Sequence, residues 1–187
     1  MKKPGILFLV LVLAGSLFMF YGCSEKSEDV SSQVEVEFRK GFDYATQGVY
    51  DKALTHFQKA VEMDPEYARA WCGMGTIYRN QEKYEEAFEN YNKALELDPE
   101  YVVCYDNLGI AYFRTGNDGE AEKAFTRAAE LDPGYADAHF NLGLLYEAVG
   151  DNAQSISEYE KYISLSSDSE KTAEVKGRIE GMKKGLN

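Results

Sequence analysis

The chain repeats itself with a period of 34 residues, and this feature constrains its fold more than any other. Two residue types stand in register with the period: Pro65, Pro99 and Pro133, and Gly41, Gly75, Gly109 and Gly143. Since no insertion interrupts the register, each period is expected to form the same small structure. One short segment cannot bury an apolar face alone, so the repeats are predicted to stack on one another.

Apolar residues within one period follow helical spacing. In the period that begins at residue 68, one helical face carries Trp71, Met74, Gly75 and Tyr78. A second run with the same spacing holds Ala87, Tyr91 and Ala94. Two amphipathic helices therefore face each other, and a glycine opposite an alanine lets their backbones approach closely. The Asp-Pro pairs are expected to end the second helix, because a residue before proline avoids the helical conformation.

The period divides the chain into four helix-turn-helix repeats and a final helix. The predicted boundaries are 34–67, 68–101, 102–135 and 136–169, followed by a C-terminal capping helix at 170–187. Repeat 4 departs from the pattern, with Ser155 and Tyr162 in place of alanines and Ser167 in place of proline. The last segment is expected to cover the end of the stack, and its cations Lys183 and Lys184 suit a helix C-terminus.

The repeat skeleton resembles the tetratricopeptide repeat (TPR), whose pattern is W-x2-L-G-x2-Y, then A-x3-F, then P. Repeat 3 carries this pattern as Tyr105, Leu108, Gly109, Tyr112, Ala121, Phe125, Ala128 and Pro133. The resemblance implies an all-α fold, a right-handed α-solenoid of four TPR units plus the capping helix. It also implies a concave side lined by the first helices, and a role in protein–protein interaction.

The first two dozen residues differ in character from the rest. Lys2 and Lys3 precede an uncharged and mostly apolar run from 6 to 21, which is typical of an export signal. The following Gly22 and Cys23 resemble a bacterial lipobox, which implies cleavage before Cys23 and its acylation, for example with palmitate. The alternative is an uncleaved anchor, since residues 6–22 are just long enough to span a bilayer. Residues 1–22 are assigned to a lipoprotein-type signal peptide or an N-terminal anchor, and 23–33 to a flexible tether.

Both interpretations place the repeats on the same side of a membrane. Basic residues stay on the cytoplasmic side, so the residues after Cys23 are expected on the extracytoplasmic side of a bacterial cell envelope, lipid-anchored. By the sorting rule of the resembling lipoproteins, Ser24 implies the periplasmic face of the outer membrane. In an oxidising compartment Cys72 and Cys104 can pair as a disulfide. The alternative is that both are small buried residues.

Composition argues against nucleic-acid binding and catalysis. The chain holds 32 acidic and 20 basic residues, and its formal net charge of −12 repels phosphate. His139 stands where the repeat skeleton has tryptophan, and His56 lies next to the skeletal Phe57, so both are interpreted as packing or surface residues. No phosphate-binding loop or metal-binding motif is present. The sequence predicts a protein that is not an enzyme, with no cofactor, no metal site and no nucleic-acid partner.

Function is expected on the concave side, which the TPR resemblance assigns to the first helix of each repeat. The predicted peptide-binding groove consists of Phe38, Phe42, Arg69, Cys72, Thr76, Arg79, Asp106, Asn107, Ile110, Phe113, Arg114, Phe140, Asn141 and Leu144. Its apolar members are not needed for the skeleton, so they are either covered by a partner or packed on their own neighbours. The asparagines are expected to reach a bound backbone, and the arginines to reach acidic groups of a ligand.

The sequence thus predicts a scaffold or adaptor similar to TPR lipoproteins of the cell envelope. It is expected to bind a peptide or helical segment and to help assemble a secretion, pilus or outer-membrane machine. Phe38 and Phe42 replace the lysine and asparagine with which some TPR domains clamp cytosolic chaperones, so that subtype is excluded. The alternative is a self-associating structural lipoprotein whose groove or end helix forms a homo-oligomer. A tether that folds back over the groove is also left open.

Overall fold

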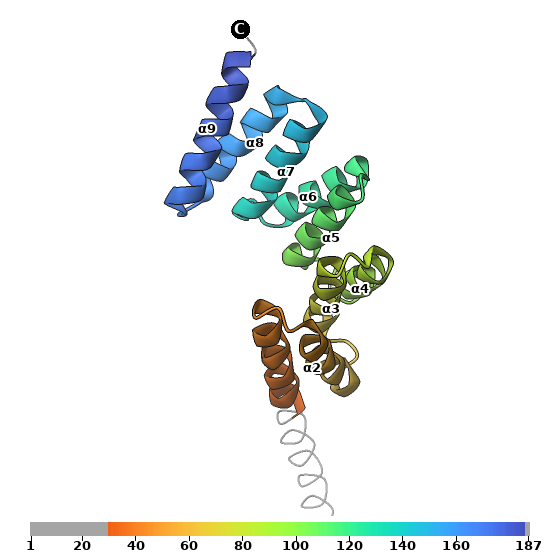
Figure 1. The fold of residues 1–187 in the computed structure, drawn as a ribbon. Coiled ribbons are helices and arrows are strands. Elements are labelled where there is room, and N and C mark those ends of the chain that lie inside the picture. The colour runs from red at the N-terminus through yellow and green to blue at the C-terminus, as the bar shows by residue number, and fades with distance from the viewer. Residues whose placement is uncertain (1–29, 186–187) are drawn as a thin grey trace, which may run out of the picture. The chain divides into compact units, whose positions relative to one another are not determined.

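The computed structural model describes residues 30–185, and this part of the chain is built of helices and loops without a strand (Figure 1). The first described helix covers residues 30–46. The next are α2 (Tyr50–Met63), α3 (Ala68–Asn80), α4 (Tyr84–Leu97), α5 (Val102–Arg114), α6 (Asp118–Leu131), α7 (Ala136–Val149), α8 (Asn152–Leu165) and α9 (Ser169–Gly185). The predicted all-α repeat fold is confirmed. The predicted signal peptide, Cys23 and the first part of the tether lie outside the described residues.

The chain divides into two compact bodies, Met1–Glu66 and Tyr67–Asn187. The N-terminal body contains helix 30–46 and α2, and the C-terminal body contains α3 to α9. In the C-terminal body α3 pairs with α4, α5 with α6, and α7 with α8. Successive pairs are joined by packing of α4 on α5 and of α6 on α7, while α9 packs on α8. The C-terminal body is therefore a row of helix hairpins with one helix added.

The first helix begins earlier than the sequence pattern predicts. Residues 30–33 were assigned to the tether, but they are helical. Val34 is buried and anchors the first turns of the helix, and no proline or glycine stands between residues 24 and 33 to stop it. Residues 30–33 therefore belong to the helix of repeat 1 rather than to a tether.

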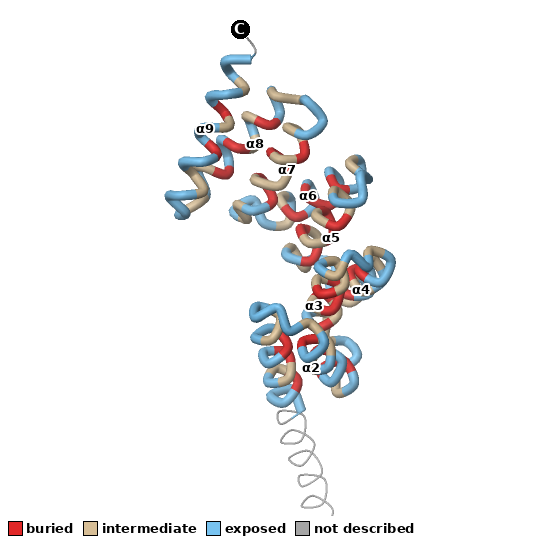
Figure 2. Tube along the Cα trace, in the orientation of Figure 1, coloured by how far each residue is buried: buried red, intermediate tan, exposed pale blue. Residues whose placement is uncertain are grey.

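Each helix pair closes on one contact between a glycine of its first helix and an aromatic ring of its second. The contacting pairs are Gly41 with Phe57, Gly75 with Tyr91, Gly109 with Phe125, and Gly143 with Tyr159. A Cβ added to any of these glycines would lie closer than 3.0 Å to the ring. The rings are buried. Figure 2 marks the buried residues of the helices in red. The glycines in register thus mark the closest approach of the two backbones, where a side chain has no room.

The turn inside each repeat requires a left-handed residue. Gly48, Gly116 and Gly150 adopt φ angles of 73°, 76° and 83°, whereas repeat 2 places Glu82 there with a φ of 61°. A residue with a Cβ is strained in this conformation, because the Cβ approaches the following carbonyl oxygen. Repeat 2 therefore carries a local strain that the other repeats avoid.

Replacing Glu82 by glycine is expected to raise the free energy of unfolding by roughly 0.5–1 kcal/mol, since the relief of strain exceeds the entropy that glycine loses on folding. Urea denaturation followed by circular dichroism measures the change. The reverse substitution in repeat 3, Gly116→Glu, is the matched control and should lower stability by a similar amount. Two variants as stable as the parent would contradict the assignment of strain.

The last helix closes the C-terminal body. Val175 and Ile179 of α9 are buried against tyrosines of α8. Lys176 and Glu180 are exposed, so the side of α9 that carries them is suited to solvent. Gly177 continues the 34-residue register of glycines, but an added Cβ there meets nothing within 4 Å. The helix thus keeps a register glycine without the ring that the four repeats place against it.

Candidate protein-binding surface

The structure sorts the predicted groove residues into three groups. The exposed members are Phe42, Arg69 and Arg114, and the half-buried members are Thr76, Arg79, Asn107, Ile110, Phe113, Phe140, Asn141 and Leu144. Phe38, Cys72 and Asp106 are buried, with exposed fractions of 8%, 2% and 6%. The predicted groove is wrong at these three positions. Neighbouring helices pack closely over the three side chains, so a ligand cannot contact them.

The two phenylalanines of the N-terminal body behave differently. The Phe38 ring packs on the Phe57 ring of α2 with their centroids 5.6 Å apart, so it belongs to the core. Phe42, one turn further along the same helix, is 56% exposed. Exposure of a large aromatic ring is unfavourable in water, and a ring in this position adds nothing to the packing of its own helix pair. Among the described residues of the N-terminal body, Phe42 is therefore the largest exposed apolar side chain.

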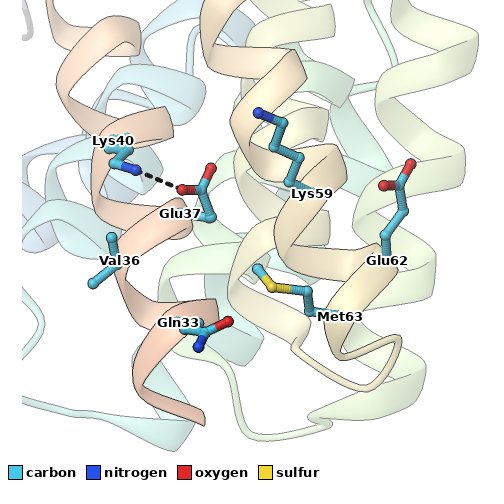
Figure 3. A pocket seen from close by; sticks show the side chains of 7 residues that line it. All are labelled: Gln33, Val36, Glu37, Lys40, Lys59, Glu62 and Met63. Carbon is cyan, nitrogen blue, oxygen red and sulfur yellow. Dashed lines mark hydrogen bonds and ion pairs between the residues drawn. The ribbon is translucent and has the colours of Figure 1, made fainter. Parts of the chain in front are cut away.

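A cleft of about 430 Å³ lies between helix 30–46 and α2 (Figure 3). It is lined by Gln33, Val36, Glu37, Lys40, Lys59, Glu62 and Met63. Across its rim the Lys40 ammonium donates to the Glu37 carboxylate at 2.6 Å. The cleft is not among the sites predicted from the sequence. The signal in the sequence is the larger Val36 at a repeat position where the later repeats have Ala70, Cys104 and Ala138. In the structure Val36 is 46% exposed, whereas the three later residues are fully buried.

Polar side chains join the first helices of successive repeats in the C-terminal body. The Arg79 guanidinium of α3 donates to Asn107 Oδ1 of α5 at 2.8 Å, and Asn141 Nδ2 of α7 donates to Asp106 Oδ1 at 2.7 Å. Asn107 also donates to the Val103 carbonyl oxygen at 2.9 Å. Both asparagines are therefore hydrogen-bonded within the protein, whereas the sequence predicts that they contact a bound backbone.

Asp106 is a buried carboxyl group in this arrangement. Burial raises the pKa of Asp106 to about 6, and the hydrogen bond from Asn141 opposes this shift. The nearby charge of Asp137 raises the pKa further, while Arg79 and Lys171 lower it. The carboxyl group stabilises the seam between α5 and α7 best when it is protonated, because desolvation penalises its charge.

The capping helix covers the part of the predicted groove that repeat 4 supplies. Phe140 and Leu144 pack against the cluster that α9 forms with α8. The Lys171 ammonium of α9 lies 3.8 Å from the centre of the Phe140 ring and pairs with Asp137 at 3.5 Å. Phe140 and Leu144 are therefore half-buried under the chain's own last helix, and their assignment to a ligand groove is corrected.

Two further apolar members of the predicted groove pack on their neighbours. Ile110 and Phe113 contact the buried cluster that contains Leu142 and Leu145 of α7. This corresponds to the second of the two alternatives that the sequence left open, in which such side chains are covered by the next repeat. The side chains of Ile110 and Phe113 are half-buried.

Of the predicted groove residues in the C-terminal body, Arg69 and Arg114 are exposed, and Thr76 and Arg79 are half-buried. We call these four residues, together with Val103, the first-helix surface. Arg69 and Arg79 are the only charged residues of α3, and Val103 is 42% exposed. The Arg79 guanidinium donates to the side-chain oxygens of Asn107 and Asn80, and its Nε is buried without a hydrogen-bond partner. A cation in such a setting favours a ligand that brings an acceptor or a negative charge.

The histidines and acidic side chains of the described residues hold helices together. The His56 ring contacts the Glu37 carboxylate and the His139 ring contacts the Glu158 carboxylate, each at 2.7 Å and each within one helix pair. Across residues 30–185 no group of histidine, cysteine and acidic side chains is arranged to hold a metal ion. In the same range no helix has the length and apolar character needed to cross a membrane.

Solved structures with this fold are numerous. A MamA crystal structure superposes with a TM-score of 0.67 at 29% identity, covering 78% of this chain and 84% of that chain. PilF of Pseudomonas aeruginosa gives a TM-score of 0.77 at 22% identity, with 84% and 72% covered. The first TPR of Spaghetti (RPAP3), bound to the HSP90 peptide SRMEEVD, gives 0.60 at 28% identity, with 64% and 95% covered.

Comparison of the sequence with protein-family models identifies the repeats. No curated protein sequence matches the chain. Tetratricopeptide repeat family models match residues 33–100 and 66–133, and a further one matches residues 107–170. Together with the helix pairs and their register glycines, these matches show that the chain belongs to the tetratricopeptide repeat family.

Proposed function

We propose that this protein is a non-enzymatic adaptor, held at a bacterial cell envelope by a lipid on Cys23, that binds a peptide or helical segment of another protein. TPR proteins mediate protein–protein interactions and are generally scaffolds rather than enzymes. The adaptor would act on the extracytoplasmic side in the assembly of a secretion, pilus or outer-membrane complex. The observation that carries the proposal is the exposed ring of Phe42 on the first helix of repeat 1.

Two further observations support binding by the first-helix surface. The related TPR of Spaghetti (RPAP3) is a domain of the same fold that holds a peptide. In this chain the first-helix surface of the C-terminal body combines the exposed Val103 with arginines, although the chain as a whole is acidic. A segment with both apolar and acidic side chains matches this composition better than a purely apolar one.

The expected affinity is modest. Association of two proteins costs roughly 4–15 kcal/mol in lost freedom, and the accessible apolar area is small, so a dissociation constant on the order of micromolar is expected. Anchoring both partners to one membrane would raise their local concentration and compensate for the weak contact.

Photo-crosslinking tests the proposal. A photo-reactive residue placed at Phe42 of the full-length chain, in cells that produce it, is expected to capture another envelope protein. Val149 is the matched control, because it is 53% exposed at the end of α7 and is not a member of the predicted groove. Equal capture from Val149 would contradict the proposal.

A self-adduct at Phe42 would favour the alternative function, a self-associating structural protein. Light scattering of the purified chain separates the two, since self-association requires a dimer or larger species without any other protein. A monomer with a heterologous adduct supports the adaptor.

Cys23→Ser tests the anchor. We expect the parent chain to incorporate an alkyne-labelled palmitate and to sediment with membranes, and the variant to lose the label. If the variant still sediments with membranes and keeps its full length, the uncleaved anchor is the correct interpretation. Label on the variant would contradict acylation at Cys23.

A further inference from the structure

We infer that Cys72 and Cys104 form an intramolecular disulfide that joins α3 of repeat 2 to α5 of repeat 3. The inference does not depend on the proposed function, although an extracytoplasmic compartment would supply the oxidant.

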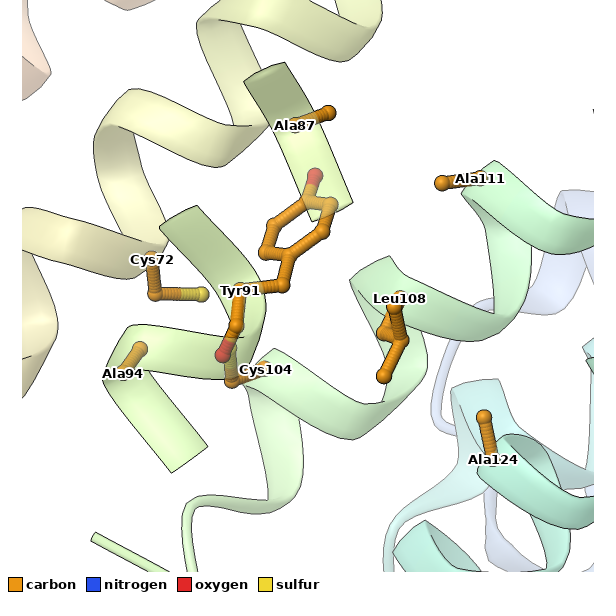
Figure 4. Close-up of a cluster of buried hydrophobic side chains, with 8 residues drawn as sticks. All are labelled: Cys72, Ala87, Tyr91, Ala94, Cys104, Leu108, Ala111 and Ala124. Atoms are coloured by element: carbon orange, nitrogen blue, oxygen red, sulfur yellow. The ribbon is translucent and has the colours of Figure 1, made fainter. Parts of the chain in front are cut away.

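The fold brings the two cysteines together. They lie on the first helices of successive repeats, which approach each other directly, and both belong to one buried cluster (Figure 4). Their exposed fractions are 2% and 0%, so both side chains lie in the interior between the two helices. In the structure both are thiols, and the Cys104 thiol also donates to the Tyr91 carbonyl oxygen at 3.8 Å.

Small neighbours give this seam its close approach. Ala87 and Ala94 of α4, both fully buried, belong to the same cluster as the two cysteines. At the next seam, between α5 and α7, the two repeat positions are taken by Asp106 and Ala138. Of these two seams in the C-terminal body, only the one between α3 and α5 therefore has a cysteine at each position.

The reaction needs a disulfide donor, either a small disulfide such as oxidised glutathione or the disulfide of an oxidoreductase. One cysteine thiolate attacks the donor disulfide, forms a mixed disulfide and releases one donor thiol. The second cysteine thiolate then attacks the chain's own sulfur in that bond and releases the other donor thiol. The chain loses two electrons and two protons, and the donor disulfide is reduced to two thiols.

Burial determines when the bond can form. The thiolate is the reactive species, and the contact with Cys72 and desolvation both raise the pKa of the Cys104 thiol. In addition, a donor disulfide in solution cannot reach the two thiols, because both are buried in the folded protein. The folded, reduced protein should therefore oxidise slowly, whereas a chain that folds in the presence of a donor should acquire the bond before α3 and α5 close over it.

The test uses the full-length chain, reduced and unfolded in urea, then refolded with a mixture of oxidised and reduced glutathione or with dithiothreitol. Folded monomer is isolated, alkylated and digested with trypsin. We expect the glutathione sample to contain peptides 70–79 and 94–114 linked to each other, at a mass two hydrogens below their sum. Reduction of this sample should lower its thermal midpoint by several degrees.

Matched variants identify the pairing. Cys23→Ser should give the same linked peptides as the parent, because Cys23 takes no part. Cys72→Ser should leave Cys104 alkylated and show no shift of the thermal midpoint on reduction. The inference is overturned if both peptides of the parent are alkylated, if either is linked only to Cys23 or glutathione, or if the linked species occurs only in unfolded protein.

Discussion

Gly109→Ala is expected to lower the free energy of unfolding by roughly 1–3 kcal/mol, the usual range for overpacking in a protein core. The new Cβ would lie 2.5 Å from the nearest ring carbon of Phe125, and that ring is 1% exposed. Because the ring also packs against Leu142 and Leu145 of α7, it cannot turn away, so α5 and α6 must separate. The intrinsic helix preference of alanine opposes this loss without cancelling it.

Gly177→Ala is the matched control for this prediction. It stands 68 residues further along, two periods on, and an added Cβ meets nothing within 4 Å. An exposed glycine inside a helix is destabilising by roughly 0.5–1 kcal/mol relative to alanine, so this variant should be more stable than the parent. Urea denaturation of both variants measures the difference. The two variants are expected to change stability in opposite directions, and a stabilised Gly109→Ala would exclude the glycine–ring contact as the determinant of packing.

Asp106→Asn is expected to stabilise the C-terminal body at pH 7 by about 2–3 kcal/mol, given 1.36 kcal/mol for each unit of pKa shift. The folded-state pKa of Asp106 is about 6, above the ordinary value of 3.8. The folded protein therefore binds this proton more tightly than the unfolded chain. The destabilising charge of Asp106 is absent below pH 4 and fully present above pH 6. The free energy of unfolding therefore falls as the pH rises between these values.

Asparagine keeps the shape and the oxygen that accepts from Asn141, but it has no charge to desolvate. The measurement is the free energy of unfolding of parent and variant at intervals from pH 4 to pH 7. The difference between them should be small at pH 4 and grow to its full size by pH 7. Glu100→Gln, on an exposed loop residue of the same body, is the control and should follow the parent profile. A constant difference across the range would contradict a raised pKa.

The period of the sequence was sufficient to predict the repeats themselves. Helical spacing determines which side of one helix is apolar, and the register glycines reveal where two helices touch, because both properties are local to a repeat. The glycine at position 109 and the ring at position 125 lie on one hairpin, so their contact follows from the pattern alone. The same reasoning identified Phe42 as an apolar residue that the skeleton does not use.

The accessible surface was decided by tertiary structure. Leu144 has the same repeat position as the exposed Phe42, but Leu144 packs against the cluster that α9 forms with α8. Asn107 and Asn141 are engaged by residues one repeat away, and Cys72 and Asp106 are buried at seams between first helices. Each of these contacts joins residues about one period apart or more. The periodicity of a single repeat describes the faces of its own helices, whereas the packing angle and closeness of the next repeat decide which of those faces water can reach.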